Sequence, residues 1–90
     1  MMRITFNERR GVITLTVEGV LGGAWVKELE RSWAETLISP DRLSVDLRSV
    51  TSIDNLGQQL LAKMHLAGTT LIGGTGPMTG YIVSRIMQTT

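Results

Sequence analysis

The chain has 90 residues, of which 42% are hydrophobic and 19% charged, and its formal net charge is +1. This composition is close to that of an ordinary globular domain and excludes an intrinsically disordered chain. The absence of cysteine excludes disulfides, thiolate metal sites and cysteine nucleophiles. No cluster of Lys and Arg interleaved with aromatic residues predicts a nucleic-acid surface.

The sequence shows no sign of a targeting or membrane segment. Residues 1–8 are not followed by the apolar run of a signal peptide. No apolar stretch approaches the ~20 residues that are needed to span a bilayer. A chain of 90 residues is long enough for one core. We therefore expect a single cytoplasmic domain covering residues 1–90, without direct membrane insertion and without a nucleic-acid partner.

Alternating apolar residues predict a hairpin at the start of the chain. Ile4 and Phe6 alternate with polar neighbours, and residues 12–18 alternate and are rich in β-branched side chains. Both patterns are typical of strands. Residues 7–11 favour a turn, because their last residue is a glycine that can adopt a positive φ. The glycines within residues 19–23 are expected to end the second strand.

A helical periodicity begins at Ala24. Apolar residues then recur every three or four positions, as on one face of an amphipathic helix; they are Val26, Leu29, Trp33 and Leu37. Residues 39–41, Ser-Pro-Asp, are expected to stop this helix. Residues 43–47 predict a short central strand, and residues 48–53 are interpreted as the loop that follows it.

The second half of the chain continues this alternation. Asp54 is suited to cap a helix that extends to about Ala67 and stops at Gly68. The core-facing positions of this helix are Leu60, Leu61 and Met64. Residues 69–72 predict a fourth strand and residues 73–77 a loop. A final short amphipathic helix is indicated by Met78, Ile82 and Ile86.

The predicted element order is therefore ββαβαβα. The hairpin is antiparallel, whereas each strand-helix-strand crossover requires parallel, right-handed pairing. We expect an α/β protein with a mixed four-stranded sheet and helices packed on it.

Few residues are candidates for catalysis. His65 is the single histidine; it has no second ligand at metal-binding spacing and is interpreted as a solvent-exposed helix residue. Asp46 and Asp54 are both expected at the carboxyl edge of the sheet, where α/β proteins bind ligands, but a strand-end cap and a helix N-cap explain them more simply. Residues 74–80 match no phosphate-binding motif and are interpreted as a loop. We expect no enzyme activity, no metal and no cofactor.

Three motifs give the chain a resemblance to a known family. In residues 45–61 a strand contains Asp-Leu and a helix begins at Asp-x-x-Gly. The matching residues are Asp46, Leu47, Val50, Thr51, Ile53, Asp54 and Gly57. Residues 17–21 (VEGVL) and 67–71 (AGTTL) match two further motifs at the correct separations. The chain thus resembles the STAS family of sulfate-transporter and anti-sigma-factor-antagonist domains, and the predicted ββαβαβα order agrees with that fold.

The resemblance implies a regulatory function rather than catalysis. Bacterial members bind a partner-switching serine-kinase-like ATPase, the anti-sigma factor, which otherwise holds a sigma factor. Phosphorylation of a Ser or Thr just before the motif glycine releases the partner. Here that position is Leu56, which cannot be phosphorylated, so the usual switch is absent. Ser49, Thr51 and Ser52 lie nearby and are interpreted either as phosphoacceptors or as hydroxyls that cap turns.

The resemblance also implies a docking surface, formed by the predicted loop at residues 49–53 and the start of the following helix. The expected partner-binding residues are Ser52, Asp54, Asn55, Leu56, Gly57 and Gln58. Asp54 would cap the helix and Gly57 would permit close approach at this docking surface. Leu56 would either contact a partner or turn into the core. Trp25 lies off the apolar stripe of its helix and would either join the docking patch or stay partly covered.

The resemblance leaves other partners open. Some domains of this type are accessory subunits of membrane transporters, and a role in binding a nucleotide or a lipid-linked ligand is a further alternative. The unpaired edge of the first predicted strand, at Ile4–Phe6, would also suit a homodimer.

Overall fold

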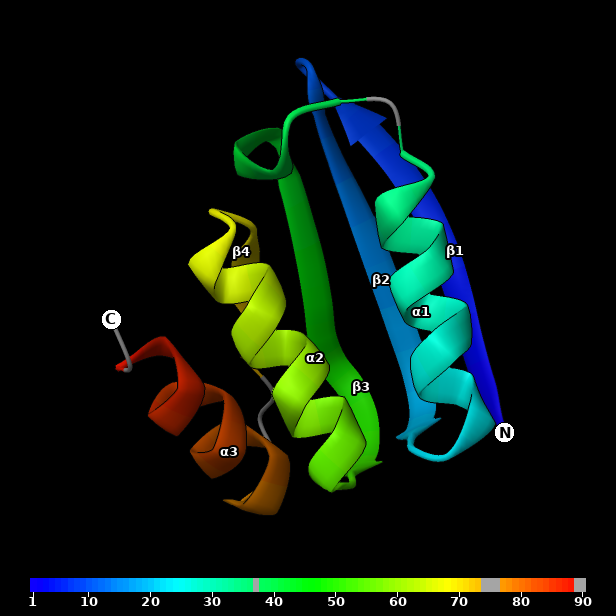
Figure 1. Ribbon diagram of the computed structural model, residues 1–90, viewed down its shortest axis with the longest axis vertical. Helices are drawn as coiled ribbons and strands as arrows, with labels where there is room; N and C mark the ends of the chain where they lie inside the picture. The colour runs from blue at the N-terminus through cyan, green and yellow to red at the C-terminus, as the bar shows by residue number, and fades with distance from the viewer. Residues whose placement is uncertain (37, 74–76, 89–90) are drawn as a thin grey trace.

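The computed structural model describes residues 1–36, 38–73 and 77–88, and its elements follow the predicted order ββαβαβα (Figure 1). These elements are β1 (Met2–Arg9), β2 (Val12–Leu21), α1 (Ala24–Ala34), β3 (Leu43–Ile53), α2 (Asn55–Leu66), β4 (Thr70–Ile72) and α3 (Pro77–Met87), with a 3₁₀ turn at Pro40–Arg42 before β3. The expected α/β fold with a mixed four-stranded sheet is confirmed, and it fits a STAS-like arrangement. None of the described helices is long and apolar enough to cross a membrane.

The strands lie in the order β1-β2-β3-β4, so β1 and β4 form the two edges of the sheet. β1 and β2 are antiparallel, whereas β2–β3 and β3–β4 are parallel pairs. Leu15 of β2 lies opposite Val45 of β3, and Val45 lies opposite Leu71 of β4. Because residues that lie opposite one another in a ladder point to the same face, these three side chains form one apolar row across the sheet.

The first hairpin is longer and tighter than predicted. Pairing extends from Met2 to Arg9, so only Arg10 and Gly11 form the turn. Arg10 has φ 54° and Gly11 has φ 80°, and a type I′ turn requires positive φ at both central residues. The prediction of a turn over residues 7–11 was wrong in its first half, because the polar residues there gain ladder hydrogen bonds to β2 that local propensity does not reveal.

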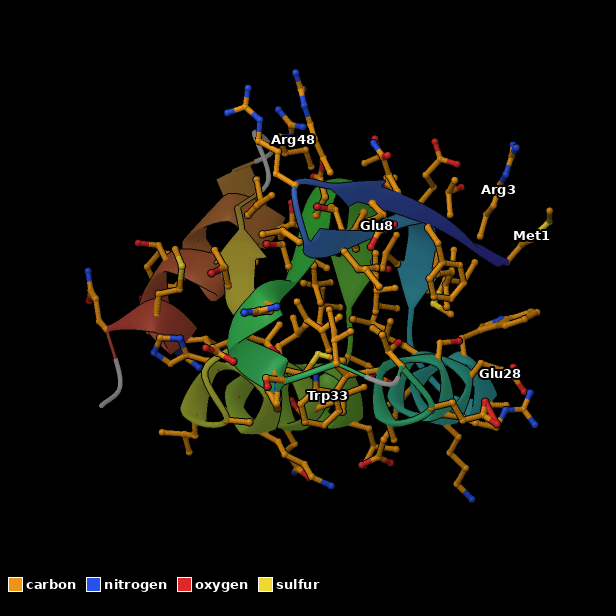
Figure 2. All side chains as sticks on the ribbon, turned by 90° about the horizontal axis from the view of Figure 1, so that it is seen from above. Met1, Arg3, Glu8, Glu28, Trp33 and Arg48 are labelled. Atoms are coloured by element: carbon orange, nitrogen blue, oxygen red, sulfur yellow. The ribbon has the colours of Figure 1, made fainter. Side chains whose placement is uncertain are left out.

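Helices α1 and α2 cover one face of the sheet, as the end-on view shows (Figure 2). The covered face and the helices together supply the core, which includes Leu15, Val17, Val45, Leu47, Leu71, Val26, Leu29, Leu61 and Met64. The other face carries polar residues from neighbouring strands, among them Thr5 opposite Thr16 and Arg3 opposite Glu18. This one-sided burial is the reason for the alternation of apolar and polar residues in β1 and β2.

Two strands continue past their predicted ends. β2 runs to Leu21 and β3 runs to Ile53. The break predicted at residues 19–23 therefore begins only at Gly22, and the predicted loop at residues 48–53 was wrong. Two register shifts in the β2–β3 ladder allow pairing to continue, as β-bulges do. The β-branched residues in the second half of β3 suit this extended conformation.

The last helix begins earlier than predicted. α3 starts at Pro77, so residues 77–80 are helical rather than part of a loop; proline is well suited to a first helical turn. α3 packs against α2, β3 and β4 and buries Val83 and Ile86. The remaining residues of the predicted loop, 74–76, and Leu37 of the predicted apolar stripe lie outside the described residues.

A chain of hydrogen bonds ties the end of α1 to the start of β4. Trp33, labelled in Figure 2, donates from Nε1 to the Thr69 hydroxyl at 3.0 Å, and that hydroxyl donates to the carbonyl oxygen of Pro40 at 2.9 Å. Gly68, with φ 103°, turns the chain out of α2, as predicted. These contacts lie at the C-terminal ends of α1 and α2, which leaves the two N-termini at the opposite end.

Candidate functional site

The N-termini of α1 and α2 lie at the same end of the molecule. Both helices follow parallel strands, so they begin where β2 and β3 end, at the bottom of the view in Figure 1. The carboxyl end of parallel strands is the common place for binding sites in α/β proteins. All of the predicted partner-binding residues lie here, from Ser52 near the end of β3 to Gln58 in the first turn of α2.

Asp54 holds the two helix N-termini together. Its Oδ1 accepts a hydrogen bond from the backbone N–H of Gly57 at 2.7 Å, which caps α2 as predicted. Its Oδ2 accepts a bond from the N–H of Gly23, the N-cap residue of α1, at 2.9 Å. These bonds, from Gly57 first and then from Gly23, lower the pKa of the Asp54 carboxyl because they stabilise its charged form. One carboxylate thus fixes the starts of both helices.

Asp54→Asn is expected to lower the melting temperature at neutral pH and to reduce the loss of stability in acid. The pKa of Asp54 is lower in the folded than in the unfolded chain. Its stabilising contribution is therefore complete above the unfolded pKa and is lost as the pH falls through the folded pKa. The melting temperatures of wild type and variant should converge as the pH falls from about 6 towards about 3. Thermal unfolding followed by circular dichroism measures both curves.

Asp41→Asn is the matched control for this experiment. The Asp41 carboxylate makes no hydrogen bond or ion pair with the described residues, so this variant should not reproduce the lower melting temperature of Asp54→Asn. If the difference in melting temperature between wild type and Asp54→Asn stayed constant with pH, the charge of Asp54 would contribute nothing to stability.

Gly57 lies buried where α2 passes the end of β2. A Cβ at this position would lie 2.8 Å from the carbonyl oxygen of Leu21 and 2.9 Å from Cγ2 of Ile53, closer than van der Waals contact allows. The absence of a side chain at Gly57 therefore lets α2 lie directly against the end of β2. Because Gly57 is buried, its part in the site is to set the position of α2, not to touch a partner.

Exposed apolar side chains lie on each segment at this end. Leu56, in the first turn of α2, is 55% exposed, so of its two predicted orientations the structure shows the outward one. Trp25 of α1 is 41% exposed, a partly covered aromatic ring, and Val20 of β2 is 40% exposed. We call Trp25 and Leu56 the apolar end; Val20 precedes the fully buried Leu21 in β2 and so points to the opposite face of the sheet. The sequence does not predict that β2 reaches Val20, because its alternation indicates a strand that ends before this residue.

A groove of about 290 Å³ runs between α1 and α2 and begins beside Leu56. It is lined by Gly23, Val26, Lys27 and Glu30 of α1 and by Leu56, Gln59, Leu60 and Lys63 of α2. Lys63 Nζ donates to Glu30 Oε2 at 2.7 Å and so links the two helices. Both sets of lining residues have the spacing of one helix face. This spacing can be read from the sequence of each helix, but the sequence does not indicate that the two helix faces lie next to each other.

The hydroxyl residues considered as phosphoacceptors lie on β3 and not on a loop. Ser49, Thr51 and Ser52 are all exposed. The Thr51 hydroxyl donates to the carbonyl oxygen of Gly19 at 3.2 Å and so helps to hold β3 on β2. Of the other predicted contact residues, Asn55 is exposed and Gln58 half-buried.

The candidate catalytic residues are not brought together. Asp46 lies within β3, where its carboxylate accepts hydrogen bonds from the backbone N–H and the guanidinium of Arg48. The Arg48 side chain is the main reason that the pKa of Asp46 lies below its ordinary value. The expectation that Asp46 and Asp54 share the carboxyl edge was wrong, because β3 runs on to Ile53. His65 is half-buried in the last turn of α2. Among the described residues, no three of His, Asp and Glu are placed to hold a metal ion.

Comparisons with known proteins bear on the fold. No protein-family model matches the chain, and no curated protein matches it. A crystal structure of a protein named Mglu is similar, with a TM-score of 0.60 and 15% sequence identity over 81% of this chain. The chain spans only 19% of the length of the Mglu chain. At this identity the similarity concerns the fold alone.

Proposed function

We propose that this protein is a cytoplasmic regulatory module of the STAS type, which binds an anti-sigma factor of the serine-kinase-like ATPase class through its apolar end. The observation that carries the proposal is the outward orientation of Leu56, at the position where the family resemblance places the phosphoacceptor. More than half of this leucine is exposed. A partner that covered it would gain the transfer free energy of a large apolar side chain.

The surroundings of Leu56 favour docking without rearrangement. Asp54 bonds to the backbone on both sides of the site, at Gly23 and at Gly57. Gly57 seats the first turn of α2 directly on the end of β2. A surface that is held in one conformation before binding loses less entropy when a partner docks.

The leucine also changes how binding would be regulated. In the family, phosphorylation adds roughly −1.5 to −2 charges to the docking surface and so releases the partner. Leu56 cannot carry that charge. We propose that binding through this surface is constitutive, in that no phosphorylation at the usual position reverses it.

Leu56→Glu is expected to abolish capture of the partner. A buried carboxylate without a counter-charge would replace an apolar contact, with a loss of at least about 2 kcal/mol, or roughly 30-fold in Kd. Affinity capture from a lysate of the source organism, followed by mass spectrometry and by calorimetry with the identified partner, measures this loss. Leu66→Glu is the matched control, because it makes the same change in the same helix at a leucine that is 68% exposed and lies at the far end of α2.

Capture of a serine-kinase-like ATPase by wild type and Leu66→Glu, but not by Leu56→Glu, would support the proposal. Equal capture by all three proteins would remove Leu56 from the interface. Recovery of transporter subunits in place of the ATPase would contradict the anti-sigma assignment and favour the accessory-subunit alternative.

A further inference from the structure

β1 presents an uninterrupted open edge. All eight of its residues pair with β2 without a register shift, and no other described strand pairs with it. Figure 1 shows β1 at the rim of the sheet, and α1 packs mainly against β2 and α2. A regular strand edge of this length, without proline or bulge, is a template for pairing with another strand.

The hydrogen-bond pattern decides which backbone groups of β1 point outward. In an antiparallel ladder, residues whose N–H and C=O face the neighbouring strand alternate with residues whose groups face away from it. The carbonyl oxygen of Met1 accepts a bond from the N–H of Val20 at 3.1 Å, so the odd-numbered residues bond to β2. The backbone groups of the even-numbered residues therefore point away from the sheet; these residues are Met2, Ile4, Phe6 and Glu8.

The same edge carries an exposed apolar side chain. Phe6 is 56% exposed, although the residue opposite it in the ladder, Leu15, is fully buried. Ile4 lies on the same face and is half-buried. Helices α1 and α2 cover this face of the sheet at Leu15 but leave it open at Phe6. A second strand beside β1 would satisfy the outward backbone groups and cover the phenylalanine at the same time.

We propose that the outer edge of β1 pairs antiparallel with the same edge of a second copy of this chain, around a two-fold axis at Thr5. The two sheets would then join into one continuous sheet. This inference does not depend on the proposed function, because β1 lies outside the apolar end and the groove.

Charge and backbone geometry select this axis. The outward backbone groups of the two copies must face each other, so an axis near the middle of β1 has to pass through Ile4, Thr5 or Phe6. An axis at Phe6 would place Arg3 directly opposite Arg9 of the other copy, and like charges at that position are unfavourable. An axis at Ile4 would shorten the ladder.

The axis at Thr5 gives a self-complementary strand pair over residues 2–8. Ile4 lies opposite Phe6 of the other copy, Arg3 lies opposite its Asn7, and no like charges face each other. This self-complementarity is what an isologous contact between two copies requires. The area of two paired edges is small, so a weak dimer is expected, with a Kd on the order of 10–100 µM.

Introducing a charge at Thr5 tests both the interface and its register. Thr5 is exposed on the polar face, and the proposed axis places it opposite itself at a closely spaced pair. Thr5→Lys and Thr5→Glu should each dimerise more weakly than the wild type, with Kd raised about fivefold by the facing like charges. An equimolar mixture of the two variants should dimerise more tightly than either variant alone, because each lysine then faces a glutamate.

Sedimentation velocity over a concentration series measures all of these states. Thr70→Lys, on the exposed residue of the opposite edge strand, is the matched control and should dimerise like the wild type. Circular dichroism of each variant shows whether the monomer is folded. A wild type that stays monomeric throughout would overturn the proposal, as would dimerisation of Thr5→Lys with the wild-type Kd or a mixture that dimerises no better than the two variants separately.

Discussion

Gly57→Val is expected to lower the free energy of unfolding by about 2–3 kcal/mol, because the new side chain has no space to occupy. Its Cβ alone would overlap the carbonyl oxygen of Leu21, which is backbone and cannot move aside as a flexible side chain can. α2 would have to shift away from β2, and Leu56 would shift with it. We therefore expect weaker partner binding together with lower stability. Urea unfolding and partner calorimetry measure the two effects.

Gln59→Val is the control for this experiment. It places valine in the same helix at an exposed residue, so it includes the cost of a β-branched residue in a helix, about 0.5 kcal/mol, without the collision. The loss in free energy of unfolding should be severalfold larger for Gly57→Val than for this control. Equal stability of the two variants would mean that α2 is not held at its observed distance from β2.

Leu61→Ala is expected to have the largest effect on stability, a loss of about 3–5 kcal/mol. Leu61 is fully buried in the core between α2 and the sheet. Its truncation removes apolar burial and leaves a cavity that rigid neighbours fill only in part. For a domain of this size each kcal/mol lowers the melting temperature by roughly 4–8 °C, so calorimetry should detect a large shift.

Leu66→Ala makes the same change five positions along the same helix, at a side chain that is 68% exposed. Its effect should stay within about 0.5 kcal/mol of zero. A comparable loss in both variants would contradict core packing as the cause, because alanine is a better helix former than leucine and helix propensity cannot explain a loss at either position.

The features that the sequence predicted well rest on local patterns. The alternation in β2, the helical stripe from Val26 to Trp33 and the N-cap at Asp54 each reflect a periodicity or a backbone requirement that a few neighbouring residues express. The glycine at position 68 belongs to the same class, because a left-handed residue at a helix end strongly favours glycine. These local signals were enough to predict the order of the elements and the type of sheet.

The predictions that were wrong involve contacts between distant segments. The second half of β3 contains serines and an arginine that suit a loop beside β-branched residues that suit a strand, and pairing with β2 across two register shifts favours the strand. The bond between Asp54 and Gly23 likewise joins residues 31 positions apart. The outward orientation of Leu56 depends on how α2 is rotated on the sheet. The close packing of Gly57 against Leu21 and Ile53 determines this rotation. No periodicity in a single segment contains this information.

The two bonds of Asp54 determine the thermodynamic signature expected of docking at the apolar end. Since one carboxylate already immobilises the first turns of α1 and α2, a partner that covers Trp25 and Leu56 would not have to order them. The heat-capacity change on binding should then match the apolar area that is covered, without the excess that accompanies folding coupled to binding. Loss of that carboxylate would let the two turns move independently, and the same contact would then show a larger heat-capacity change and faster dissociation.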